Sequence, residues 1–400
     1  MTTIATRTPS HRSGRAGGPL SVQLRSVPRT SELFFEAGWR DLERRSVHSS
    51  PFLSPSFLLS QPGVFSPDDS AQLLTVMDAD GRWYAAGVFE AVTGSRQLPA
   101  PHLQAVRGQH CFLSGLLLDP AHAGEAIGAI WRALDAQGLH GVAFPQFPIE
   151  SRLGDLLSSH CSGQQLAVVT DGVQHRATVS LDDASNNVGI SEKRTKSLQK
   201  GRRALARHGN VGSRFRDCSR DDPSAIDEFL RLESLGWKGE AGSSLASTRR
   251  EADWFRTVAL SLSMQDRIRF AELLVDDRVI ASMCLLRAQS EYFAFKIGWD
   301  PQWERGCPGF LLAAEVRAHL GQLTGCERID GCARPGSFLD HVWPGRMAVG
   351  DVVFTTNRFG SMLAIGTQWA RSLLRKWRGP AGEVPQRAVG SDAVAGGTPA

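Results

Sequence analysis

The sequence lacks most of the patterns that define a class of protein directly. Its seven cysteines are odd in number and form no C-x-x-C pair, so neither a disulfide framework nor a zinc site is predicted. No stretch approaches the roughly 18 consecutive apolar residues of a transmembrane helix. The segment from Met1 to Pro19 has no apolar core, which argues against a secretory signal. We therefore expect a cytoplasmic protein without a bound metal ion.

Signatures of covalent and nucleotide chemistry are also absent. The sequence contains no nucleophile elbow, no H-E-x-x-H, no Walker A motif and no Cys/His cluster. The lack of a nucleophile motif suits a direct transfer mechanism without establishing one. The formal net charge is only +4 over 400 residues, which is low for an RNA-binding protein. Nucleic acid is therefore not an expected partner.

A polar junction at residues 183–187 separates two parts of the chain, and a length of 400 residues suggests two domains. We expect both domains to be of the α/β (α+β) class, each with a mixed central sheet flanked by helices. Both contain a meander followed by a helix and a strand, which indicates a degenerate tandem duplication. The expected domains are residues 20–183 and 186–378, between disordered tails at 1–19 and 379–400.

Hydrophobic periodicity predicts the elements of each part. In the first part we expect helices at 31–46 and 124–136, and strands or apolar runs at 73–77, 83–89, 111–118, 142–147, 166–170 and 175–181. In the second part we expect helices at 191–208, 222–235, 248–262 and 309–320, and strands at 211–218, 268–275, 279–286, 292–298, 328–332 and 351–355.

The most distinctive local feature is the segment from Trp303 to Phe310, between a predicted strand and a predicted helix. Its two glycines can expose backbone N–H groups at a helix N-terminus, where the helix dipole favours phosphate oxygens. Arg305 adds a charge-assisted donor, and we expect Gly309 to let phosphate approach the backbone. An ordinary helix start with turn glycines would have the same pattern.

Two further segments have the chemistry of a substrate site. The helix containing Glu233 ends in a glycine-rich stretch with Trp237 and Lys238. This stretch can line a substrate channel, or it can be a simple helix C-cap. In the strand 292–298, alternation places Tyr292, Ala294, Lys296 and Gly298 on one face. A lysine in the middle of a strand must reach solvent or a partner, so this face is predicted to line a cleft.

Two helices are rich in basic residues. The helix 191–208 is predicted to be a solvated charged face, with anionic substrate, RNA or membrane as alternatives. The helix from Met362 to Trp377 mixes apolar residues with arginine and lysine. We expect it to pack on the domain in preference to a membrane-surface role.

Taken in order, these segments resemble the GNAT acyltransferases, and in particular the cellulose-biosynthesis-protein-like acetyltransferases, which are related to the Fem peptidyltransferases. The resemblance covers about 130 residues of the second part. Its matching segments are Ser191–Lys196 with Arg202–Leu205, Leu232–Gly239, Phe295–Asp300 and Gly306–Leu312.

The resemblance implies an N-acyltransferase that moves an acyl group from acetyl-CoA or another acyl-CoA directly to a small-molecule, glycan or peptide amine. The implied coenzyme A loop consists of Arg305, Gly306, Cys307, Pro308, Gly309 and Phe310. A backbone N–H near Phe295 to Ile297 would hold the oxyanion. The implied base is Glu233 or Asp300, with Asp330 third, and Tyr292 would protonate the thiolate. Trp237, Lys238, Lys296 and Asp330 are candidate substrate contacts.

The sequence departs from the family pattern in two places. The segment after Asp330 lacks the Tyr-Lys pair of many relatives, and Arg305 is followed by Gly-Cys-Pro-Gly instead of the usual R-x-x-G-x-G/A. Two other functions therefore stay open, a Fem-like aminoacyl-tRNA-dependent transferase and a non-catalytic GNAT-fold scaffold. The first part has no comparable loop and is predicted to be a non-catalytic half that shapes the substrate groove.

Overall fold

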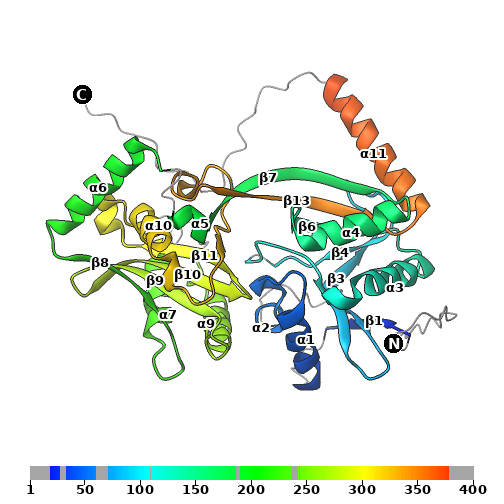
Figure 1. Ribbon diagram of the computed structural model, residues 1–400, viewed down its shortest axis with the longest axis horizontal. Helices are drawn as coiled ribbons and strands as arrows, with labels where there is room; N and C mark the ends of the chain where they lie inside the picture. Colours follow the sequence, from blue (N-terminus) through cyan, green and yellow to red (C-terminus); the bar gives the residue numbers. More distant parts are fainter. Residues whose placement is uncertain are drawn as a thin grey trace.

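The computed structural model describes residues 19–27, 33–59, 71–108, 110–185, 190–235, 242 and 244–377. Trp237, Lys238 and nearly all of both predicted tails lie outside these residues. The described parts of the chain form a 13-stranded mixed sheet flanked by helices (Figure 1). This confirms the predicted α/β class. The strand order is β1-β2-β3-β4-β6-β13-β7-β12-β11-β10-β9-β8, with β5 paired to β3.

The first part of the chain supplies one end of the sheet and the helices beside it. Its strands are β1 (Ser21–Ser26), β2 (Ala71–Met77), β3 (Trp83–Val92), β4 (His102–Ala105), β5 (Leu117–Leu118), β6 (Gly141–Pro148) and β7 (Val168–Ser180). Its helices are α1 (Leu33–Arg45), η1 (Pro51–Leu53), α2 (Pro55–Leu58), η2 (Pro120–His122), α3 (Ala123–Ala136), α4 (Arg152–Gly163) and α5 (Leu181–Ser185).

The second part supplies the other end. Its strands are β8 (Val211–Arg216), β9 (Ile268–Val275), β10 (Arg278–Ala288), β11 (Glu291–Trp299), β12 (Arg328–Asp330) and β13 (Gly345–Thr355). Its helices are α6 (Glu192–Ala206), α7 (Ser224–Ser234), α9 (Arg249–Ser263), η3 (Pro301–Gly306), α10 (Pro308–Ala318), η4 (Leu320–Gln322), η5 (Phe338–His341) and α11 (Arg358–Trp377).

Local sequence signals explain where the helices of the second part begin. Ser191 caps α6 by accepting a hydrogen bond from the backbone N–H of Arg194. Thr248 caps α9 in the same way through Glu251, whose acidic side chain stands in the first turn. In α7, Ala225, Ile226, Phe229 and Leu230 are buried at helical spacing, so this helix presents one apolar face to the sheet.

The two ends of the sheet are joined by strands that cross between the parts. β13, near the end of the described chain, pairs antiparallel with both β6 and β7 of the first part. β7 in turn pairs with β12 of the second part. As a result the two predicted domains share one sheet, and the strand predicted at 351–355 lies among strands of the first part.

Several elements differ from the sequence predictions. β7 is one strand where two were expected, because the residues between them continue to pair with β13. The apolar run 111–118 is buried but contains only the two-residue strand β5. β1, β4 and α4 were not predicted. β1 has only one buried residue, β4 has only four residues, and α4 has only four buried positions.

In the second part, helices cover both faces of the sheet. α6 and α10 lie on one face, and α7 and α9 lie on the other (Figure 1). The second face also packs against the first part, since Phe52 of η1 contacts Phe293 at a ring-centroid distance of 5.7 Å. Phe57 of α2 meets Trp254 of α9 at 5.3 Å. The core on this face therefore contains side chains from both parts.

Candidate active site

A β-bulge interrupts β11 in the middle of the candidate site. Cys284 of β10 pairs with Lys296, and Leu285 pairs with Ala294, so Phe295 is the additional residue. An additional residue shifts the side-chain alternation of a strand. The prediction that Tyr292, Ala294, Lys296 and Gly298 share one face is therefore wrong.

The bulge divides these residues between the two faces of the sheet. Tyr292 and Ala294 belong to the core on the α10 side. Lys296 instead reaches Glu233 of α7. Gly298 lies so close to α7 that a Cβ on it would stand 2.5 Å from the Cα of Glu233. The bulge thus turns Lys296 toward α7.

β11 extends well beyond its neighbour β12. The two strands are parallel, and their pairing covers Glu291, Tyr292 and Phe293 of β11. β12 ends at Asp330, while β11 continues to Trp299. Within the described chain, the stretch from Ala294 to Trp299, which includes the bulge, therefore has no pairing to β12. Backbone groups of this stretch lie at an opening in the sheet.

β11 leads directly into the predicted phosphate loop. The loop is η3, and Cys307 follows it in the left-handed conformation, with φ 47° and ψ 55°. Pro308 occupies the first turn of α10, where a missing N–H costs nothing. Cys307 gives the helix no side-chain capping hydrogen bond. The backbone N–H groups of Gly309 and Phe310 therefore lie in the first turn of α10, where N–H groups have no acceptor within the helix.

α6 packs tightly against this loop through two glycines. A Cβ on Gly201 would lie 2.6 Å from the carbonyl oxygen of Gly306, and a Cβ on Gly306 would overlap the side chain of Leu205. The close approach brings the exposed Lys200 near Cys307. Burial raises the pKa of the Cys307 thiol overall, while the charge of Lys200 acts to lower it. Two exposed cations, Lys200 and Arg305, therefore accompany the N-terminus of α10.

Gly309 lies against the end of β11. A Cβ on Gly309 would meet the Trp299 ring at 3.1 Å and Ile297 at 3.6 Å. The missing side chain therefore makes room for Trp299 of β11, and the expectation that it lets phosphate approach the backbone stays a prediction. The N–H of Gly309 remains in the first turn of α10.

Glu233 and Lys296 form a buried ion pair on the α7 side of the bulge. Lys296 Nζ donates to Glu233 Oε1 at 3.1 Å, and the backbone N–H of Leu245 donates to Oε2 at 2.7 Å. The Glu233 side chain is fully buried and that of Lys296 is 12% exposed. Removing one partner of such a pair would leave the other charge buried and uncompensated.

A histidine from the first part completes this side of the site. His110 stacks on Trp254 of α9 at 5.1 Å and lies edge-on to Phe295. Its Nε2 atom is buried without a hydrogen-bond partner and stands 3.6 Å from a carboxylate oxygen of Glu251. Burial, and then the charge of Lys296, lower the pKa of His110 to about 3. The ring is therefore neutral at neutral pH, with one polar atom unsatisfied.

Asp330 lies on the same side of the sheet but is held by another cation. It pairs with the buried Arg176 of β7 and accepts the backbone N–H of Cys332 at 3.0 Å. Arg176 also donates to the carbonyl of Phe112 at 2.9 Å. The Phe112 ring contacts Phe295 at 5.8 Å. The segment 110–112 of the first part thus reaches from Asp330 to the bulge.

The other two catalytic candidates are engaged elsewhere. Asp300 begins η3 by accepting the backbone N–H of Gln302 at 3.0 Å, and it pairs with Arg278 at 2.6 Å. Tyr292 is buried on the α10 side, and its hydroxyl donates to the carbonyl of Thr324 at 3.3 Å. Burial is the main cause that raises the pKa of Tyr292. The structure does not bring Tyr292 together with Glu233.

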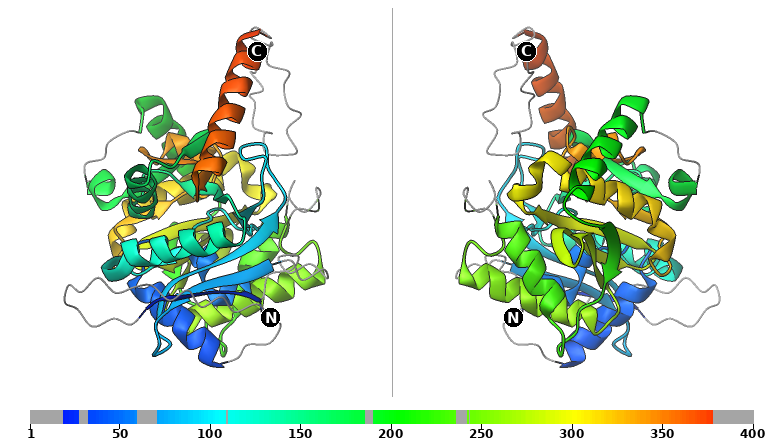
Figure 2. Two further views of the ribbon diagram at one scale, coloured as in Figure 1. Left: turned by 90° about the vertical axis from the view of Figure 1, so that its right-hand side faces the viewer. Right: turned by 90° about the vertical axis from the view of Figure 1, so that its left-hand side faces the viewer.

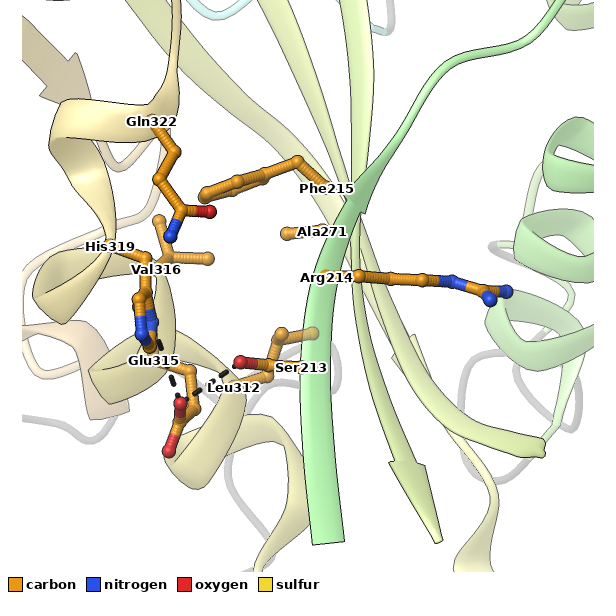
Figure 3. A pocket seen from close by; sticks show the side chains of 9 residues that line it. All are labelled: Ser213, Arg214, Phe215, Ala271, Leu312, Glu315, Val316, His319 and Gln322. Carbon is orange, nitrogen blue, oxygen red and sulfur yellow. Dashed lines mark hydrogen bonds and ion pairs between the residues drawn. The ribbon is translucent and has the colours of Figure 1, made fainter. Parts of the chain in front are cut away.

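Two cavities lie outside this group of residues. A cavity of about 60 Å³ separates β8 from the C-terminal half of α10, and Glu315 closes one side by accepting from Ser213 at 3.0 Å (Figure 3). Arg214 points away from it. A groove of about 540 Å³ lies between α1 and the turn after β10. It is lined by charged groups that include the pair Arg267 and Glu43, 2.5 Å apart.

The family model described as an acetyltransferase (GNAT) domain matches residues 192–360. This range contains the bulge, the loop before α10 and the Glu233–Lys296 pair. Residues 192–360 are therefore similar to GNAT acetyltransferase domains. The match ends before most of α11 and leaves the first part uncovered. No curated protein matches the chain.

Solved structures resemble most of the chain in fold. A conserved protein of unknown function from Bacteroides thetaiotaomicron has a TM-score of 0.51 and 9% identity, covering 84% of this chain and 99% of that one. FemX has a TM-score of 0.50 and 9% identity, covering 83% and 97%. The C-terminal domain of a putative lysylphosphatidylglycerol synthetase from Agrobacterium fabrum has a TM-score of 0.47 and 15% identity, covering 85% and 96%. At these identities the likeness concerns the fold alone.

Sequence reasoning missed His110 and Arg176. Both come from the part of the chain expected to be non-catalytic, and neither stands in a motif. Only the pairing of β7 with β12 and the packing of 110–112 on Phe295 bring them to the site. The β-bulge was also missed, because an additional residue in a strand leaves no mark in an apolar run.

Proposed function

We propose that the chain is an N-acyltransferase that moves an acyl group from an acyl-CoA thioester to an amine by direct transfer. The observation that carries the proposal is the arrangement at the end of β11. A bulge in a stretch free of β12 pairing is followed directly by an uncapped helix N-terminus with two exposed cations. The match to GNAT acetyltransferase domains supports the same activity.

The pyrophosphate of coenzyme A is assigned to the N-terminus of α10. The N–H groups of Gly309 and Phe310 and the helix dipole favour an anion there. Arg305 and Lys200 add charge-assisted contacts from η3 and α6. The coenzyme would then run along β11 toward the bulge, where the thioester meets the acceptor. Acetyl-CoA is the simplest donor.

The amine acceptor is assigned to the α7 side of the bulge. The amine nitrogen attacks the thioester carbonyl carbon. The C–S bond then breaks, and the coenzyme A thiolate that leaves takes up a proton from water. In this scheme the Lys296 ammonium stabilises the negative oxygen of the tetrahedral intermediate. The unpartnered Nε2 of His110 accepts a hydrogen bond from the amine and orients it. Glu233, which lies against β11 at Gly298, receives the amine proton directly or through water.

A Fem-like aminoacyl-tRNA-dependent transfer is the second candidate. One observation favours it: α6 packs through Gly201 and Leu205 and leaves Lys193, Lys196, Arg202 and Arg203 exposed. Such a basic surface suits a phosphate backbone. Binding of tRNA that weakens steeply with salt, in the absence of any turnover of acyl-CoA, would support this candidate over the first.

The experiment that tests the proposal is an assay of coenzyme A thiol release. Purified protein is incubated with acetyl-CoA and longer acyl-CoAs, with and without a panel of amines. The proposal expects thiol release that depends on an amine and is lost in Lys296→Met. Release that is absent with every donor, in a protein that is folded, would overturn it.

A further inference from the structure

The last described helix carries an apolar face that nothing in the described chain covers. α11 packs on β7 and β13 through one side, where Ser361 and Ala364 are buried. Arg371 anchors the same side by pairing with Asp171 of β7. The prediction that this helix packs on the domain is thus right for one face only. The helix projects from the rest of the protein (Figures 1 and 2).

The opposite face is a continuous stripe of large apolar side chains. Met362, Ile365, Trp369 and Leu373 follow one another at intervals of three or four residues, which places them on one side of a helix. Their exposed fractions are 62%, 55%, 65% and 43%. Phe359, 51% exposed, and Leu374, 55% exposed, border the stripe. A face this apolar is costly in water and marks an interaction surface.

The charges of α11 indicate the kind of partner. The sequence of the helix contains Arg358, Arg371, Arg375 and Lys376, and it contains no aspartate or glutamate. Apart from Arg371, which is paired with Asp171, these cations stand at the two ends of the helix. A partner must therefore offer an apolar surface to the stripe and must be compatible with positive charge at both ends of the helix.

A second copy of the chain fits these charges poorly. Two copies related by a twofold axis would pair their α11 stripes either antiparallel or parallel. In both arrangements the ends of the two helices, which are basic in sequence, would lie beside each other. An anionic lipid surface instead offers hydrocarbon to the stripe and negative headgroups to both ends. Trp369, in the middle of the stripe, is of the residue type enriched at membrane interfaces.

We propose that α11 docks the protein on an anionic membrane surface, lying in the plane of the interface with Met362, Ile365, Trp369 and Leu373 inserted. No described helix is long and apolar enough to cross a membrane, so this is a peripheral contact. It leaves the face with Ser361 and Ala364 attached to the sheet. The proposal is independent of the acyl transfer, because α11 lies almost entirely beyond the matched range.

The test is flotation of the full chain with vesicles of phosphatidylcholine alone or mixed with phosphatidylglycerol. We expect flotation with the mixed vesicles, weakened by high salt because surface charges are screened. The double variant Ile365→Ser/Trp369→Ser should lower the partition coefficient by at least about tenfold. Its fold should be intact, since both side chains are exposed. Met264→Ser is the matched control, because Met264 is 73% exposed at the end of α9 and should change nothing.

Two results would overturn the proposal. One is a wild-type protein that floats with neither kind of vesicle. The other is a wild-type dimer in light scattering that the double variant converts to a monomer, with vesicle binding equal in both proteins. That second result would assign the stripe to a second copy of the chain.

Discussion

Lys296 Nζ donates a hydrogen bond to Glu233 Oε1 at 3.1 Å, and this contact joins the bulged strand to the end of α7. Because both side chains are buried, removing one charge leaves the other without its partner. We expect Glu233→Gln to lower the free energy of unfolding by about 3 kcal/mol. Turnover of the folded fraction should fall by roughly 10²–10⁴-fold, since the base is lost. Chemical denaturation and a turnover assay measure the two effects separately.

The double variant Glu233→Gln/Lys296→Met distinguishes a chemical role from a structural one. Removing both charges avoids an unpaired buried ion, so stability should recover to within about 1 kcal/mol of wild type. Turnover should stay low. A stable double variant with wild-type turnover would show that the pair only holds the fold together.

The nitrogen of His110 is expected to act on the acceptor amine. His110→Phe keeps a ring against Trp254 but removes the unpartnered Nε2. The variant should raise KM for the amine and lower kcat, while its affinity for acyl-CoA stays unchanged. Steady-state kinetics with varied amine and a separate acyl-CoA titration measure these quantities. If the variant instead bound both the amine and acyl-CoA more weakly to the same extent, the result would indicate a general loss of structure.

The same variant has a second readout in the pH dependence of stability. Burial, with Lys296 second, lowers the pKa of His110 from 6.5 to about 3. Below about pH 6.5 His110 therefore binds a proton in the unfolded chain but stays neutral in the folded chain. Because of this difference, the free energy of unfolding falls as the pH falls toward 3. His110→Phe should lose less stability than wild type between neutral pH and about pH 4.5. Parallel stability curves for the two proteins would contradict this placement of His110.

The contact of α6 with the phosphate loop should be sensitive to one methyl group. A Cβ on Gly201 would stand 2.6 Å from the Gly306 carbonyl oxygen, so Gly201→Ala must push α6 or the loop aside. We expect a loss of about 1–3 kcal/mol in the free energy of unfolding together with weaker acyl-CoA binding. Gly366→Ala in α11 is the control, because its Cβ would meet nothing within 4 Å and should not destabilise. An unchanged Gly201→Ala protein would refute the close packing.

Much of the second part could be predicted because its elements are long and periodic. The helix from Arg249, the meander β9-β10-β11 and the strand-to-helix turn at 301–308 have local signals in capping residues, alternation and turn residues. The position of β13 could not be predicted. Its sequence is compatible with any neighbour, and only tertiary pairing places it between β6 and β7.

The candidate site was predictable only where it rests on contiguous residues. The loop from Arg305 to Phe310 is one segment, and its glycine pattern points to a backbone site. Glu233 and Lys296 were both singled out, but their pairing depends on a bulge that reverses the predicted face of Lys296. His110 is 186 residues away from Lys296 in sequence, so no local pattern could connect the two.

The central claim is that the N-terminus of α10 holds the pyrophosphate of coenzyme A. Calorimetric titration with acetyl-CoA and longer acyl-CoAs tests it most directly, in wild type, Arg305→Ala and Lys200→Ala. We predict that wild type binds and that each variant loses on the order of 1–2 kcal/mol, the value of one charge-assisted bond. Lys196→Ala, one turn away on α6 and paired with Glu192, should bind like wild type. No binding of any acyl-CoA to wild type, or equal affinity in all four proteins, would contradict the account.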